Sequence, residues 1–156
     1  MARIVASNIG ETPFQRLLGH NSELLDDWSR LGDTLETKGF LSAELKEQVR
    51  RALAQGNGCT YCKAKGRPEP DKYNEKTAIS VGFAEVFLKK KGDISHSSFE
   101  VLKEIFTVEE ISELCAFICF TTASQYFGAM MNLEGSRSLS QSREKIIYLM
   151  SELIKK

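Results

Sequence analysis

The sequence lacks an excess of charge of either sign, and it lacks any long apolar run. Its 21 basic residues balance its 21 acidic residues, so the chain has no positive field of the kind that binds nucleic acid or anionic lipid. The longest uninterrupted apolar run, Leu114 to Phe120, is far shorter than the roughly 20 residues of a membrane-spanning helix. Residues 1–7 hold no apolar segment long enough for a secretory signal. We therefore expect a cytoplasmic protein that binds neither nucleic acid nor a membrane.

Histidine and several common catalytic motifs are also scarce or absent. The only histidines are His20 and His96, and each lies beside a predicted helix end, which indicates a surface or capping role. The sequence has no GxSxG nucleophile elbow, no Walker A loop and no HExxH metal motif. It does have four cysteines. In a cytoplasmic chain these are redox-active, metal-bound or buried rather than a structural disulfide framework.

Helical patterns are present along most of the chain. Apolar residues recur at the spacing of a helix face, whereas no stretch of five or more residues alternates like a half-buried strand. Capping residues and glycine stops separate the patterns. The expected helices begin near Pro13, Asn21, Ser42, Cys59, Asn74, Ser97, Thr107 and Ser138. We predict an all-α helix bundle with short loops, folded as a single domain over residues 1–156.

Three details of these helices are testable against the structure. The segments 97–100 and 107–110 both match the capping-box pattern. The final helix carries an apolar stripe over residues 146–154, which predicts packing against the body of the protein or against a second subunit. The second helix is expected to face inward with Leu24, Leu25, Trp28, Leu31 and Leu35.

The candidate reaction centre is the stretch Gly56-Asn57-Gly58-Cys59-Thr60-Tyr61-Cys62. The glycines end the preceding helix, because glycine adopts positive φ at little cost. A glycine and two prolines within residues 66–70 exclude a long helix after the cysteines. We expect one or two helical turns from Cys59 and then a loop.

The spacing of the pair suits thiol chemistry. Only a thiolate is nucleophilic, so a reactive cysteine needs a lowered pKa. A helix start at Cys59 and the nearby Lys63, Lys65 and Arg67 all favour the anion. Both sulfurs would lie on one side of the first turn, where they can close a disulfide after one has become a sulfenic acid.

Glu47 lies twelve residues before Cys59, on the helix that leads into this stretch. If that helix packs against the CxxC turn, the Glu47 carboxylate can reach a sulfur. Partial burial near the thiols would raise its pKa and let it pass protons near neutral pH.

The residues alone leave two other uses of the pair open. The pair can be half of a zinc site, with Cys115 and Cys119 as the remaining thiol ligands. Those two cysteines lie on an apolar helix, however, and we expect them to face the core as small apolar side chains. The pair can also be inert and merely packed, although a buried inert pair needs no glycine-rich backbone before it.

The combined pattern resembles the carboxymuconolactone decarboxylase / AhpD-like alkylhydroperoxidase family. The resemblance lies in Glu47, the Cys59-Thr60-Tyr61-Cys62 motif after eleven intervening residues, and the segments 83–85 and 107–111. It covers about residues 12–135, which leaves residues 136–156 as a C-terminal helix. It implies an all-helical AhpD-like fold, a homo-oligomer, and peroxidase or disulfide-reductase activity without a metal or organic cofactor.

The resemblance also implies roles for single residues. Cys62 would attack the peroxide, Cys59 would resolve it as a disulfide, and Glu47 would belong to a proton relay. An external dithiol, such as a lipoylated protein, would reduce the pair again. The family has histidines where this chain has Tyr61 and Gly66; Tyr61 can still donate a hydrogen bond, whereas Gly66 supplies nothing. Two alternatives share the fold: a non-catalytic redox sensor, and a decarboxylase acting on a lactone acid.

Overall fold

A computed structural model describes residues 1–135, and this part of the chain is helical with no strand. Its α-helices are α1 (Pro13–Leu18), α2 (Ser22–Thr37), α3 (Ala43–Gly56), α4 (Thr60–Ala64), α5 (Glu75–Lys90), α6 (His96–Ile105) and α7 (Val108–Met130). One 3₁₀ turn, η1 (Pro70–Lys72), precedes α5. The predicted all-α fold is thereby confirmed. The expected C-terminal helix and its stripe at 146–154 lie outside the described residues.

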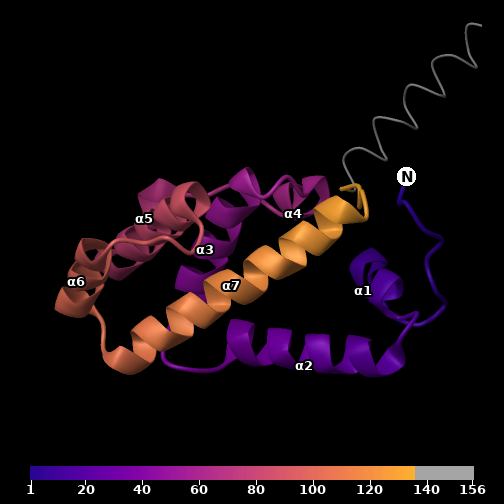
Figure 1. The fold of residues 1–156 in the computed structure, drawn as a ribbon, viewed down its shortest axis with the longest axis horizontal. Coiled ribbons are helices and arrows are strands. Elements are labelled where there is room, and N and C mark those ends of the chain that lie inside the picture. Colours follow the sequence, from indigo (N-terminus) through magenta and orange to yellow (C-terminus); the bar gives the residue numbers. More distant parts are fainter. Residues whose placement is uncertain (136–156) are drawn as a thin grey trace, which may run out of the picture.

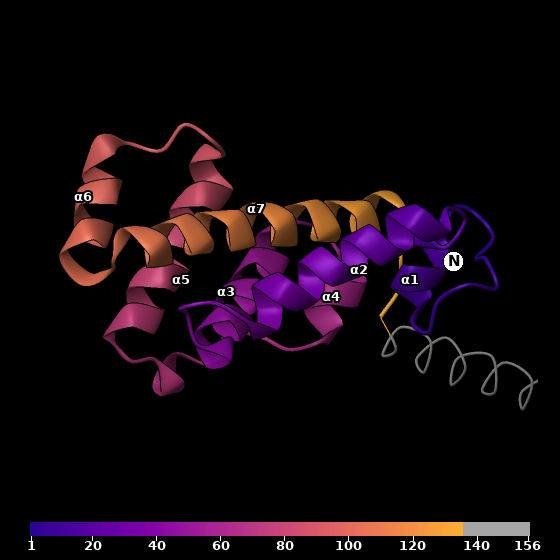
Figure 2. The same ribbon diagram turned by 90° about the horizontal axis from the view of Figure 1, so that it is seen from below.

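The long helix α7 organises the molecule. It runs diagonally across Figure 1, with α3, α4 and α5 on one side and α1 and α2 on the other. Figure 2 shows α2 alongside α7 from below, with α6 at the far end. The main core lies where α3, α5 and α7 meet, and its most buried members include Val49, Leu53, Ala84, Leu114, Phe117 and Ile118. This packing holds the end of α3, and therefore the CxxC segment, against the C-terminal half of α7.

The helix ends follow local capping chemistry at most positions. Thr107 caps α7 with a complete capping box, in which Glu110 reaches back to the Thr107 backbone. The box expected at residues 97–100 is wrong. Helix α6 begins earlier, after Ser95, and the Glu100 carboxylate instead binds Lys103 at 2.7 Å.

Two expectations about buried faces are wrong in part. On α2, Leu25 is buried, but Leu24 and Leu31 are exposed. On α7, both cysteines were expected to face the core; Cys119 is exposed, whereas Cys115 is half-buried and packs against the main core. Ile118 takes the inward position on α7, and the next residue along a helix lies about 100° away from it.

No helix in residues 1–135 is long and apolar enough to cross a membrane.

Candidate redox site

The turn between α3 and α4 places the two cysteines. Helix α3 ends at Gly56 with the buried Asn57 as its C-cap, and Gly58 has φ +76°, a conformation that favours glycine. Cys59 is then the N-cap of α4: its sulfur accepts a hydrogen bond from the Cys62 backbone N–H at 3.1 Å. The expected start of a short helix at the CxxC motif is confirmed. The N-terminal end of α4 therefore donates an N–H group to the Cys59 sulfur, and such a contact stabilises a thiolate.

Cys59 and Cys62 are joined in a disulfide, with their Cα atoms 5.2 Å apart. The pair packs with Ala54, Tyr61 and Ala129 in a small cluster separate from the main core. Cys115 and Cys119 are free thiols. Residues 1–135 contain no group of three or more metal-binding side chains that could hold an ion, so these two cysteines do not complete a zinc site with the pair.

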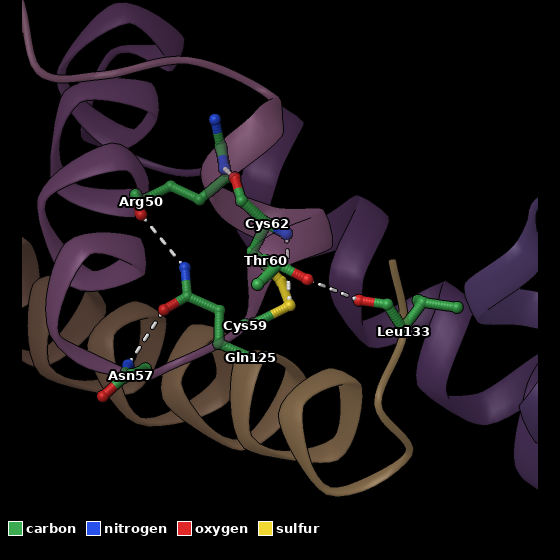
Figure 3. Close-up of a disulfide and its surroundings, with 7 residues drawn as sticks. All are labelled: Arg50, Asn57, Cys59, Thr60, Cys62, Gln125 and Leu133. Atoms are coloured by element: carbon green, nitrogen blue, oxygen red, sulfur yellow. Dashed lines mark hydrogen bonds between the residues drawn. A yellow bond between two sulfur atoms is a disulfide. The ribbon is translucent and has the colours of Figure 1, made fainter. Parts of the chain in front are cut away.

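A set of polar contacts fixes the disulfide against α7 (Figure 3). Gln125, which is almost fully buried, accepts a hydrogen bond from the Asn57 amide at 2.9 Å and donates one to the Arg50 carbonyl at 3.0 Å. Thr60 donates its hydroxyl hydrogen to the Leu133 carbonyl at 3.0 Å. These contacts join the end of α3 to α7, and the start of α4 to the segment after α7.

Gly128 on α7 gives the sulfurs their space. A Cβ at this position would lie 2.8 Å from the Cys59 sulfur and 3.7 Å from the Cys62 sulfur. No residue larger than glycine therefore fits at position 128 without displacing the disulfide.

Gly128→Ala is expected to destabilise the oxidised protein by about 1–3 kcal/mol, because a methyl group overpacks the sulfur pair. Gly82→Ala is the matched control, since Gly82 lies within α5 and has open space around its Cβ position. That control should stabilise by about 0.5–1 kcal/mol through its better helix propensity. Chemical denaturation measures both variants. Equal stabilisation of the two would show that the sulfurs move aside without cost.

A cleft of about 210 Å³ opens beside the disulfide. Cys62 lines it and keeps 8% of its surface exposed, whereas Cys59 is 0% exposed and does not line it. The apolar part of the wall is formed by Phe14, Leu18, Trp28, Tyr61 and Phe120. The charged part is formed by Asp33, Glu36, Arg50 and Lys65. Access to the pair is therefore asymmetric, and a small molecule in the cleft meets the Cys62 side.

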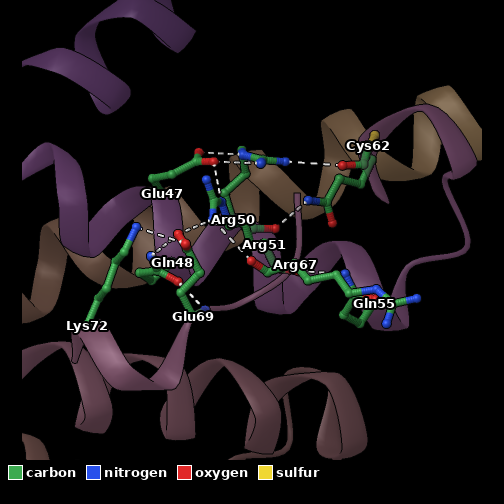
Figure 4. A network of polar contacts seen from close by, with 10 residues as sticks. Glu47, Gln48, Arg50, Arg51, Gln55, Cys62, Arg67, Glu69 and Lys72 are labelled. Atoms are coloured by element: carbon green, nitrogen blue, oxygen red, sulfur yellow. Dashed lines mark hydrogen bonds and ion pairs between the residues drawn. The ribbon is translucent and has the colours of Figure 1, made fainter. Parts of the chain in front are cut away.

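Glu47 does not line this cleft. Its carboxylate accepts hydrogen bonds from Arg50 at 2.7 and 2.8 Å and from Arg51 at 2.7 Å (Figure 4). Burial alone would raise the pKa of Glu47, but the two arginines outweigh it and hold that pKa below its ordinary value. The expectation that the pKa of Glu47 is raised is therefore wrong. Glu47 instead orients Arg50, whose Nη1 donates to the Cys62 carbonyl at 3.3 Å.

The same network anchors the loop that follows α4. Arg51 forms an ion pair with Glu69 and donates to the Arg67 carbonyl at 3.1 Å. Gly66 in this loop has φ +132°, and a Cβ there would lie 3.1 Å from the Arg51 guanidinium. The position where the resembled family carries a second histidine is thus a turn that favours glycine and lies against an arginine.

Tyr61 and Lys65, from the α4 region, also line the cleft. The Lys65 ammonium lies over the Tyr61 ring, 4.8 Å from its centroid. Burial, followed by the Arg50 charge, lowers the pKa of Lys65. Tyr61 itself is half-buried and packs beside the cysteines. Tyr61 therefore lies against the Cys59–Cys62 disulfide, as its position within the CxxC motif indicates.

Two carboxylates of α2, Asp33 and Glu36, line the same cleft as Cys62. Glu36 lies in the last turn of that helix. Its side chain keeps an exposed surface, but the walls of the cleft remove part of the water around its carboxyl group. This desolvation raises the pKa of Glu36 and outweighs the opposing charges of Lys65 and Arg50. Nothing in the linear pattern marks Glu36, because it is 26 positions from Cys62 and belongs to no motif.

Comparison with known proteins shows the fold alone. The chain matches no family model and no curated protein. It superposes on an uncharacterized peroxidase-related protein from Silicibacter sp. TM1040 with a TM-score of 0.69 and 14% identity, over 76% of this chain and 73% of that one. It superposes on the debrominase Bmp8, a cysteine-to-alanine variant in complex with 2,3,4-tribromopyrrole, with a TM-score of 0.69 and 17% identity, over 85% and 81%. The chain has the AhpD-like helical fold expected from its sequence.

Proposed function

We propose that this protein is a thiol–disulfide oxidoreductase that reduces peroxides through the Cys59–Cys62 pair. The observation that carries the proposal is the asymmetric disulfide, with Cys62 at the wall of a cleft and Cys59 buried behind it. A pair that is merely packed needs no such opening. The peroxidase-related description of one structural neighbour supports the same class of reaction.

The proposed cycle balances with a peroxide and a dithiol. The Cys62 thiolate attacks one peroxide oxygen, the O–O bond breaks, and the leaving oxygen takes up a proton to become an alcohol or water. Cys62 is then a sulfenic acid. The Cys59 thiol attacks the Cys62 sulfur, water leaves, and the disulfide forms. An external dithiol reduces this disulfide through a mixed disulfide and is itself oxidised to a disulfide.

The surroundings of Cys62 support its role as the attacking residue. Arg50 and Lys65 bring positive charge to the cleft that Cys62 lines, and positive charge favours a thiolate. Cys59, at the N-cap, accepts the Cys62 N–H, and its position suits a resolving thiol that meets no substrate directly. A lipoylated protein is a suitable dithiol reductant, because its flexible arm can reach a recessed disulfide.

The test is catalytic peroxide consumption with dihydrolipoamide as the reductant. We expect many turnovers, and we expect the reduced protein to lose the mass of two hydrogens on treatment with peroxide. Peptide mapping should then recover Cys59 linked to Cys62, with Cys115 and Cys119 unlinked. Consumption of a single equivalent, with reversible disulfide formation, would favour a redox sensor instead. Conversion of a lactone acid that survives Cys62→Ser would favour the decarboxylase.

A further inference from the structure

Breaking the O–O bond of a peroxide leaves a strongly basic oxygen that needs a proton. The group that supplies this proton must face the same space as Cys62. The histidine positions of the resembled family hold Tyr61 and Gly66 in this chain. Glu47 is held by two arginines outside the cleft. A side chain that supplies this proton must therefore be another group on the cleft wall.

The charged and titratable groups of the cleft come from three elements. Helix α2 contributes Asp33 and Glu36, α3 contributes Arg50, and the α4 region contributes Tyr61 and Lys65. The residues that α1 and α7 contribute to the lining are uncharged. Arg50 is an unsuitable proton donor because guanidinium stays protonated in proteins. Asp33 and Glu36 lie three residues apart on α2. Glu36 lies in the last turn of this helix, and the charges of Lys65 and Arg50 act on its carboxyl group.

We propose that Glu36 donates the proton to the leaving oxygen when Cys62 attacks a peroxide. This inference rests on the proposed function. In the step, the Cys62 sulfur bonds to one peroxide oxygen, the O–O bond breaks, and the Glu36 carboxylic acid gives its proton to the other oxygen. The products are the Cys62 sulfenic acid, an alcohol or water, and the Glu36 carboxylate, which takes a proton back from solvent.

The surroundings of Glu36 suit this role. Partial enclosure by the cleft raises its pKa, so the acid form persists to a higher pH than it would for an ordinary surface glutamate. Lys65 and Arg50, whose charges oppose this rise, would stabilise the carboxylate left after donation. The two effects together favour a carboxyl group that both gives up and regains a proton.

The experiment compares two reactions of reduced Cys62 in the wild type and in Glu36→Gln. Oxidation by peroxide needs both a thiolate and a proton donor, whereas alkylation by iodoacetamide needs only the thiolate. We expect Glu36→Gln to slow the peroxide reaction by about 10²-fold and to leave the alkylation rate within about twofold. The matched control is Glu23→Gln, the same change on α2 outside the cleft, which should change neither rate.

The pH profile supplies a second readout. The rate constant for peroxide, corrected for the thiolate fraction by alkylation, should fall in the wild type as pH rises through the pKa of Glu36. In Glu36→Gln that fall should vanish, because an amide does not titrate. Retention of the fall in Glu36→Gln, with its loss in Lys65→Gln, would assign the donor to Lys65 and overturn the inference.

The two proposals can fail separately. A wild-type Cys62 that is alkylated but does not react with peroxide refutes the proposed function, and the role of Glu36 falls with it. If Glu36→Gln reacts with peroxide as fast as the wild type, only the role of Glu36 is refuted. Retention of normal alkylation by the variant excludes misfolding as the cause of a slow peroxide reaction.

Discussion

Cys62→Ser is expected to abolish peroxide consumption, whereas Cys59→Ser should keep the first oxidation and lose only the turnover. The reason is the unequal exposure of the two sulfurs: Cys62 lines the cleft, and Cys59 is 0% exposed behind it. A serine hydroxyl has no accessible anion near neutral pH and cannot replace the attacking thiolate. Without Cys59, the Cys62 sulfenic acid has no nearby thiol to condense with.

Stopped-flow measurement of peroxide loss and dimedone labelling of the sulfenic acid measure these outcomes. Cys59→Ser should bind dimedone at Cys62 after one equivalent of peroxide. Cys119→Ser is the control, because Cys119 is a free, exposed thiol on α7 that does not line the cleft. It should leave the rate unchanged. A dimedone adduct on Cys59 in the Cys62→Ser protein would reverse the assignment of the two thiols.

Lys46→Met is expected to destabilise the fold by about 3–5 kcal/mol, because it leaves a largely buried carboxylate without its cation. Lys46 is 2% exposed, and its ammonium lies 2.6 Å from the carboxylate of Glu113 on α7, which is 12% exposed. The same carboxylate accepts the backbone N–H groups of Phe40 at 2.6 Å and Leu41 at 3.3 Å. One ion pair thus fixes the loop between α2 and α3 against the long helix.

Lys103→Met is the matched control for this ion pair. Lys103 pairs with Glu100 at 2.7 Å, but the two side chains are 55% and 51% exposed, so its loss should cost only about 0–1 kcal/mol. Urea denaturation of the two variants at neutral pH measures the difference. Similar losses in both proteins would show that burial adds nothing to the Lys46 pair. The double variant Lys46→Met with Glu113→Gln should recover part of the stability, because the uncompensated charge is gone.

The same pair predicts the acid sensitivity of the wild type. Burial would raise the pKa of Glu113, but hydrogen bonds from Lys46 and the backbone outweigh it and lower that pKa in the folded protein. A depressed pKa gives stability that is present above the unfolded value and lost as pH falls through the folded value. Stability should therefore decline below about pH 4. Glu113→Gln, which cannot titrate, should show a smaller decline.

The sequence by itself determined the local parts of this protein. Helix starts and stops follow from side chains that bond neighbouring backbone groups, so Thr107 and the glycine-rich turn before Cys59 could be predicted from their neighbours alone. The helix start expected at Cys59 is local in the same sense, because the Cys59 sulfur binds the backbone N–H of Cys62 in the next turn. The resemblance to a family of known fold supplied the arrangement of helices.

Only the tertiary structure decided which side chains share the cleft. Helical spacing gives the angle of a residue on its own helix, but it does not say which other helix covers that face. Glu47 has the right spacing to Cys59, yet Arg50 and Arg51 hold it outside the cleft, while Glu36 enters the cleft from α2. Gly128 meets the sulfurs for the same reason, because α7 crosses the CxxC turn at that residue. These contacts depend on packing between segments far apart in sequence, and no local pattern encodes them.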